Sequence, residues 1–93
     1  MTDYVIRVEM HGATYADYER LHALLAAKSV TNFIYSDDRV RYRLPTAMYT
    51  YTGPETPQHV RDSVAQITAS VRPNPAVFVT VRGASTWQGL IAA

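Results

Sequence analysis

Three side chains of complementary chemistry alternate near the start of the chain. Arg7, Glu9 and His11 follow one another at intervals of two residues, which places side chains on the same face of a β-strand with roughly 7 Å between neighbours. A carboxylate, an imidazole and a guanidinium in a row supply a general base, a general acid and a clamp for an anion. The alternatives are a solvated face with ordinary cross-strand ion pairs, or a face covered by a dimer partner.

A second charged cluster lies in the middle of the sequence. Arg41 and Arg43 would share one face of a short strand, where they could hold the phosphodiester backbone of RNA. The alternative is a charged hairpin whose arginines keep an edge strand from aggregating. Asp37 and Asp38 precede them and are interpreted as turn formers rather than as ligands of a metal ion.

Two tyrosines define a third candidate site. Tyr49 and Tyr51 would share a face of one strand. On an uncovered sheet face they would stack on RNA bases, whereas on the helix-facing side they would belong to the core. The pattern does not distinguish these possibilities, because Met48 and Thr50 make no better core face.

No metal or cofactor site is expected. The chain contains three histidines without the spacing of metal ligands. It also lacks a P-loop, a dinucleotide-binding glycine fingerprint and a serine elbow. The remaining histidines, His22 and His59, are interpreted as structural or solvated residues.

The composition predicts one globular domain over residues 1–93. The hydrophobic fraction of 47% and the charged fraction of 18% argue against disorder. The absence of cysteine excludes disulfides and thiolate zinc sites and favours a reducing compartment. We expect a cytoplasmic protein without membrane contact, because neither a signal peptide nor an apolar stretch of ~18 residues is present. The net charge of +1 gives no global attraction to nucleic acid.

The strands and helices that must position these residues are predicted from the periodicity of apolar residues and from the residues that start and stop each element. Alternation predicts strands, a 3.6-residue period predicts helices, and the dipeptide Thr56-Pro57 marks a helix start. The expected strands span 4–11, 31–35, 47–52 and 76–81, with 40–44 interpreted as an extension of the hairpin that starts at 31–35. The expected helices span 15–28 and a segment from 57 that Pro73 stops. This order predicts a ferredoxin-like β-α-β-β-α-β sandwich, with a four-stranded antiparallel sheet and two helices on one face. We expect the first and last strands to be central.

The C-terminal segment is more apolar than a free end requires. Residues 84–93 include Trp87, Leu90 and Ile91. We therefore expect this tail to pack, with a partner subunit as one candidate surface. A homodimer through the tail or through the open sheet face follows as an expectation.

Several stretches resemble the GhoS family, the endoribonuclease antitoxins of type V toxin–antitoxin systems. Tyr4–Glu9 is similar to the family's first strand, which ends in an acidic residue, and Tyr18–Leu24 resembles its first helix. The turn Ser36–Asp38, the dipeptide Leu44–Pro45 and the tyrosine-rich strand that follows match in layout. The resemblance covers roughly residues 3–72 and consists of element order and a few residue types.

The resemblance implies a ferredoxin-like fold related to the CRISPR-adaptation nucleases and sequence-biased cleavage of single-stranded messenger RNA, including the message of a partner toxin. In that group an acidic residue ends the first strand, and Glu9 is the match here. Glutamate stands where the wider group has aspartate, so its carboxylate reaches one methylene further.

Two functions follow as hypotheses. The first is a GhoS-like antitoxin that binds or cuts single-stranded RNA, with Glu9 and His11 as base and acid in a metal-independent reaction. Arg7, Arg41 and Arg43 would then hold the phosphate, with Tyr49 and Tyr51 contacting bases. The second is a non-catalytic interaction module, such as a small phage- or plasmid-encoded inhibitor, that docks on a host or toxin protein.

Overall fold

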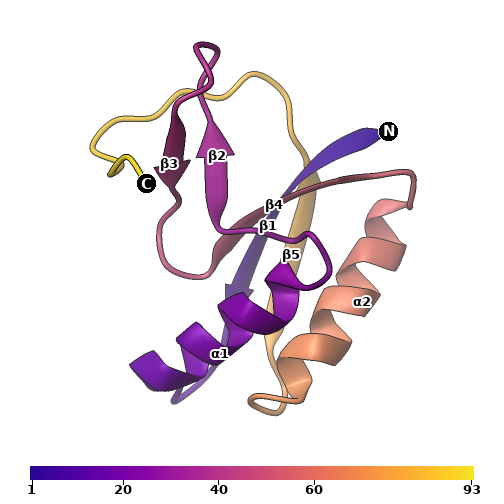
Figure 1. Ribbon diagram of the computed structural model, residues 1–93. Coiled ribbons are helices and arrows are strands. Elements are labelled where there is room, and N and C mark those ends of the chain that lie inside the picture. The colour runs from indigo at the N-terminus through magenta and orange to yellow at the C-terminus, as the bar shows by residue number, and fades with distance from the viewer.

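Two helices and five strands make up the chain, which a computed structural model describes over all residues 1–93 (Figure 1). The elements in chain order are β1 (Thr2–Glu9), α1 (Tyr15–Ala26), β2 (Phe33–Tyr35), β3 (Arg41–Arg43), β4 (Met48–Gly53), α2 (Pro57–Ala69) and β5 (Ala76–Val81). All strand pairs are antiparallel, which confirms the α+β class. Neither helix has the length and apolarity needed to cross a membrane.

The main sheet has three strands in the order β4-β1-β5. The expectation that the first strand is central is confirmed, whereas the expectation for the last strand is wrong. β5 pairs only with β1 and forms an edge. Its apolar run is explained by packing against α2 rather than by a central position.

A separate hairpin, β2-β3, stands where a fourth strand was expected. One backbone bridge, Thr31 to Thr50, links the segment before β2 to the free edge of β4. A continuous four-stranded sheet is therefore not formed, although the hairpin adjoins the sheet. Figure 1 shows the hairpin projecting beyond the end of the sheet that lies away from α1.

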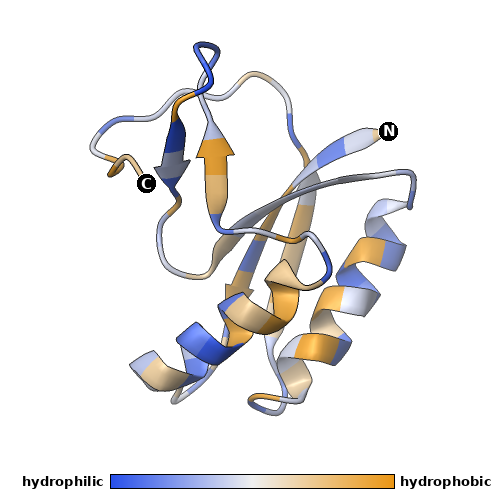
Figure 2. Cartoon of the chain, in the orientation of Figure 1, coloured by the Kyte–Doolittle hydropathy of each residue, from blue (hydrophilic) through white to orange (hydrophobic).

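The core lies between the main sheet and the two helices. Tyr4, Ile6 and Val8 of β1 are buried against the helices, where Leu21 and Leu25 of α1 meet them. Figure 2 shows apolar segments in both helices and in the strands behind them.

Both helices begin where the sequence predicts. The Thr14 side chain accepts a hydrogen bond from the Asp17 amide, and the Asp17 carboxylate accepts one from the Thr14 amide, which forms a capping box. Thr56 caps α2 directly before Pro57. Asp17 also accepts a hydrogen bond of 2.8 Å from Arg72, which ties the turn after α2 to the start of α1.

The C-terminal tail packs within its own chain. Ala92 bridges to Tyr42 of β3, and the Trp87 ring lies 5.7 Å from the Tyr42 ring, centroid to centroid. Backbone amides of Arg43 and Ala93 donate to carbonyls of Ile91 and Arg41, respectively. The expectation that the tail packs is confirmed. Its packing surface is the outer edge of the hairpin, and Ile91 stays 76% exposed there.

Candidate functional site

One face of the main sheet has no helix over it, and we call it the uncovered face. Ile6 and Val8 are 0% and 2% exposed on the helix side of β1, whereas Arg7 and Glu9 alternate with them and are exposed. The prediction that the apolar side of the first strand packs against the helices is confirmed. It follows that Arg7 and Glu9 lie on the uncovered face of the central strand.

Strand register places Arg7 between two apolar side chains. Arg7 is paired with Met48 of β4 on one side and with Phe78 of β5 on the other. Directly opposed residues of an antiparallel pair have Cβ atoms roughly 5 Å apart, so Phe78 and Arg7 are neighbours on this face. The Phe78 residue is 67% exposed. An aromatic ring open to solvent therefore lies beside a guanidinium at the centre of the uncovered face.

The carboxylate and the imidazole form a pair at one end of this face. His11 Nδ1 lies 3.5 Å from Glu9 Oε1, and the two side chains are 66% and 69% exposed. His11 does not belong to β1, which ends at Glu9; it lies in the turn at Gly12, whose φ of 68° suits a residue without a side chain. The turn brings the imidazole within 3.5 Å of the carboxylate.

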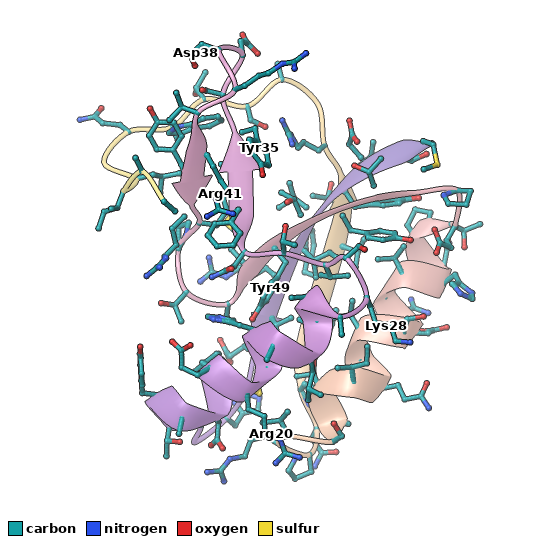
Figure 3. The ribbon with its side chains drawn as sticks, viewed as in Figure 1. Arg20, Lys28, Tyr35, Asp38, Arg41 and Tyr49 are labelled. Atoms are coloured by element: carbon teal, nitrogen blue, oxygen red, sulfur yellow. The ribbon has the colours of Figure 1, made fainter.

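The two hairpin arginines lie away from this site. The Arg41 guanidinium sits over the Phe33 ring, 4.3 Å from its centroid, and its Nε donates to the Ala93 carbonyl at 3.4 Å. Arg43 lines a hollow shared with His22 of α1, on the helix-covered side of the molecule. Arg41 and Arg43 therefore belong to the separate hairpin, whereas Arg7 belongs to the main sheet, and the structure shows no contact that brings the three together. That they hold one phosphate chain stays a prediction. In Figure 3, Arg41 belongs to the hairpin region above α1.

The tyrosines proposed to stack on bases belong to the helix-covered side. Tyr49 is 0% exposed, and Figure 3 shows it between the sheet and α1. Burial raises the pKa of its hydroxyl far above the ordinary value. A base cannot reach this ring, so the stacking role of Tyr49 is corrected to a core role.

Tyr51 lies on the same side as Tyr49, and its hydroxyl is engaged. It donates a hydrogen bond to the Glu55 carboxylate, whose two oxygens lie 2.9 and 2.7 Å from the Tyr51 hydroxyl oxygen. This hydrogen bond raises the pKa of Tyr51 and lowers that of Glu55. The half-buried ring packs against the core from the helix side, and its hydroxyl holds the loop before α2. Tyr51 is therefore not part of the uncovered face, and its stacking role stays a prediction.

The acidic turn of the hairpin shows structural hydrogen bonds. The Ser36 hydroxyl donates to Asp38, and the Ser36 carbonyl accepts from the Arg39 amide. No group of three or more histidine, aspartate or glutamate side chains comes close enough together to hold a metal ion. The interpretation of Asp37 and Asp38 as turn formers fits this geometry.

Phe78 is the residue of the uncovered face that sequence reasoning missed. The density of apolar residues in Ala76–Val81 suggested a central strand of the sheet. Alternation along the same strand indicates the face on which Phe78 lies. Val77 and Val79 share one face, and Ala76, Phe78 and Thr80 share the other. The structure makes that division, with Val77 and Val79 packed against the core.

Comparison with known proteins identifies no relative, since no protein-family model matches this chain and no curated protein sequence is significantly similar to it. The resemblance to the GhoS family stays a prediction that depends on the residues quoted above.

Proposed function

We propose that the uncovered face binds single-stranded RNA and that the Glu9–His11 pair cleaves it. The observation that carries this proposal is the placement of an exposed phenylalanine, an arginine and an acid–base pair on one sheet face that no helix covers. Sheet faces of small α+β domains recognise single-stranded RNA with such exposed rings, on which unstacked bases lie.

The order of the side chains fits the repeat of a nucleotide chain. A base stacked on Phe78 would bring an adjoining phosphate next to Arg7, whose planar fork matches phosphate oxygens. Glu9 follows on the same strand, roughly 7 Å further along. A phosphodiester held by Arg7 therefore lies within one residue spacing of the Glu9–His11 pair.

The chemistry expected is transfer to the neighbouring 2′-hydroxyl. A base takes the 2′-hydroxyl proton, the 2′ oxygen bonds to phosphorus, the bond to the 5′ oxygen breaks, and that oxygen takes a proton. The attacking and leaving oxygens lie on opposite sides of phosphorus. Two groups 3.5 Å apart act on one side. We therefore assign His11 as the base, oriented by the Glu9 carboxylate, with water as the proton source for the leaving oxygen.

A ferredoxin-like topology forms part of the same proposal. With Thr31 bridged to Thr50, the spatial order of strands is β5, β1, β4 and then the β2 region. The β2 region thus stands where a fourth strand would complete a β-α-β-β-α-β sheet. Together with the quoted resemblance, this supports a GhoS-type antitoxin that acts on messenger RNA.

The test is cleavage of labelled single-stranded RNA in the presence of EDTA. We expect the wild type to cut, His11→Ala to lose about 100-fold in rate, and Glu9→Gln to lose less, because a positioning group contributes less than the base it orients. Equal cleavage by the wild type and His11→Ala would overturn the catalytic assignment. RNA binding without any cleavage would leave the RNA-binding part and remove the reaction.

The control variant is Arg20→Gln, which removes an exposed arginine from α1 on the opposite side of the molecule (Figure 3). It changes net charge as much as Arg7→Gln does. We expect only Arg7→Gln to weaken RNA binding strongly. Equal weakening by the two would show a general effect of charge instead of a site on the sheet.

A second function is favoured by the apolar residues of the edge strand. Phe78 and Val81 are 67% and 57% exposed on β5, the strand with an unpaired edge. Phe78 belongs to the uncovered face. Val81 follows the alternation of Val77 and Val79 on the other face, so the two exposed residues suit a protein partner that contacts the edge of β5 from both sides. Of the two, only Phe78 would be buried by a homodimer that covers the uncovered face. Light scattering at micromolar concentration tests the homodimer, and a monomer together with RNA binding would favour the first function.

A further inference from the structure

A hollow of about 440 Å³ lies between α1 and the β2-β3 hairpin, on the side of the molecule opposite the uncovered face. Its volume is within the range of roughly 300–1,000 Å³ that is typical of small-molecule sites. The side chains that define its character are Tyr15, Tyr18, His22, Phe33 and Arg43. Aromatic rings therefore form much of the wall, and one guanidinium stands among them.

The Arg43 guanidinium has no partner within the protein. The three ion pairs of the chain involve other residues, and the side chain of Arg43 donates no hydrogen bond, although its backbone amide does. By contrast, Arg41 on the same strand is engaged with a ring and a carbonyl. Arg43 is exposed and thus free to receive an anion with its full set of donors.

His22, which lines the hollow, carries an unsatisfied polar atom and contacts Tyr49 behind it, which carries another. His22 Nε2 and Tyr49 Oη are the two buried side-chain polar atoms in the molecule that lack a hydrogen-bond partner. Their rings meet edge to face, with centroids 5.5 Å apart. Buried polar groups of folded proteins are nearly always paired, so a pair of adjacent exceptions next to a hollow points to a polar partner that enters there.

We propose that this hollow binds a nucleoside monophosphate unit. The base would lie against the aromatic wall and reach His22 with its polar edge, and the phosphate would lie on Arg43. Glu19 also lines the hollow, and its carboxylate opposes additional negative charge, so a monophosphate fits better than a triphosphate. A free nucleotide and one nucleotide of an RNA strand present the same chemistry. The proposal does not depend on the uncovered face.

The test is titration of the isotopically labelled protein with each of the four nucleoside 5′-monophosphates, followed by backbone amide NMR. Inorganic phosphate and a short single-stranded oligonucleotide are separate arms. We expect shifts around residues 15–22 and 43–46, and Arg43→Gln should weaken binding at least about tenfold. His22→Phe, which keeps a ring but removes Nε2, should reduce the preference among the four bases.

The matched control is Arg20→Gln, an exposed arginine of α1 that does not line the hollow. It should bind like the wild type. Arg43-dependent shifts with mononucleotides support a free-nucleotide source, and such shifts with the oligonucleotide alone support an RNA source. No shifts at millimolar ligand, shifts with inorganic phosphate equal to those with nucleotides, or unchanged binding by Arg43→Gln would each overturn the proposal. Loss of RNA binding in Arg7→Gln with hollow shifts retained would separate the two sites.

Discussion

The two faces of the central strand contrast in what their side chains touch. On the helix side, Tyr4, Ile6 and Val8 are at most 2% exposed and take part in the core. On the other side, Arg7 and Glu9 are exposed, and the only ion-pair contact there is the one between Glu9 and His11. The side chains on one face of β1 are thus packed in the core, and Arg7 and Glu9 on the other face are exposed.

This contrast predicts that the residues that stabilise the fold and the residues that bind a ligand lie on different faces of β1. Side chains that contact little in the folded protein add little to its stability, so their chemistry is available for a ligand. Buried side chains contribute to stability through their contacts, and their replacement changes function only by changing the fold. Variants on the two faces should therefore fall into two classes, which the following predictions test.

The largest effect is expected for Ile6→Ala. Ile6 is 0% exposed on the central strand, and its truncation should lower the free energy of unfolding by about 2–5 kcal/mol through lost burial and a residual cavity. Urea denaturation followed by circular dichroism measures it. Arg7→Ala, the next residue, should change the stability by less than about 0.5 kcal/mol. A comparable loss in both variants would break the division into two faces.

Gly53→Ala should produce the next largest loss on the helix side. A Cβ at this position would clash with the Glu55 carboxylate and the Tyr51 hydroxyl and would lie 2.7 Å from Tyr51 Cε2. We expect a destabilisation of about 1–3 kcal/mol as the ring and the loop before α2 move. Thermal unfolding measures the loss, and Gly83→Ala is the matched control, because nothing lies within 4 Å of a Cβ there. Equal melting temperatures for both variants would contradict the prediction.

How far the sequence predicts the structure differs between these regions. Alternation and capping residues predict β1 and both helices, since a one-sided core imposes the period of two on β1 and Thr14 and Thr56 satisfy free helix amides. The same alternation does not predict which face of β4 is buried. There Tyr49 and Tyr51 compete with Met48 and Thr50 for the core, and the contact of Tyr49 with His22 decides the face only in three dimensions.

The local sequence pattern predicts neither the direction of the β2-β3 hairpin nor the edge position of β5. Arg41 and Arg43 are correctly predicted as strand neighbours, but which side of the molecule they reach depends on how the hairpin departs from the sheet after Thr31. The edge position of β5 likewise depends on pairing between distant segments. The exposure of Phe78 depends on the absence of a helix over its face of the sheet, which alternation along β5 indicates and apolar density alone does not.

On the uncovered face, Phe78→Ala should weaken the binding of single-stranded RNA by about tenfold, since stacking of one base on an aromatic ring contributes about 1–3 kcal/mol. The stability should change little, because the residue is 67% exposed. Fluorescence anisotropy with a labelled oligonucleotide measures the affinity. The control is Tyr35→Ala, which removes a ring that is 58% exposed on the hairpin. Equal losses in the two variants would remove the site from the sheet face.

The smallest effect is a pH dependence that arises on the helix-covered side. Burial lowers the pKa of His22 from its ordinary value of 6.5, the Arg43 charge lowers it further, and the Glu19 charge opposes both. The unfolded chain then binds a proton more readily than the folded one. The contribution to stability is therefore complete above about pH 6.5 and is lost as the pH falls toward the lower folded value.

Replacement of this imidazole by an uncharged ring should remove that dependence. Between about pH 7.5 and about pH 5.5, the melting temperature of the wild type should fall by ~2 °C more than that of His22→Phe. His59→Gln is the control, because His59 is exposed in the first turn of α2 and its replacement leaves the His22–Tyr49 contact intact. If His59→Gln flattens the profile and His22→Phe does not, the pH sensitivity belongs to the surface, and the two faces are alike in this respect.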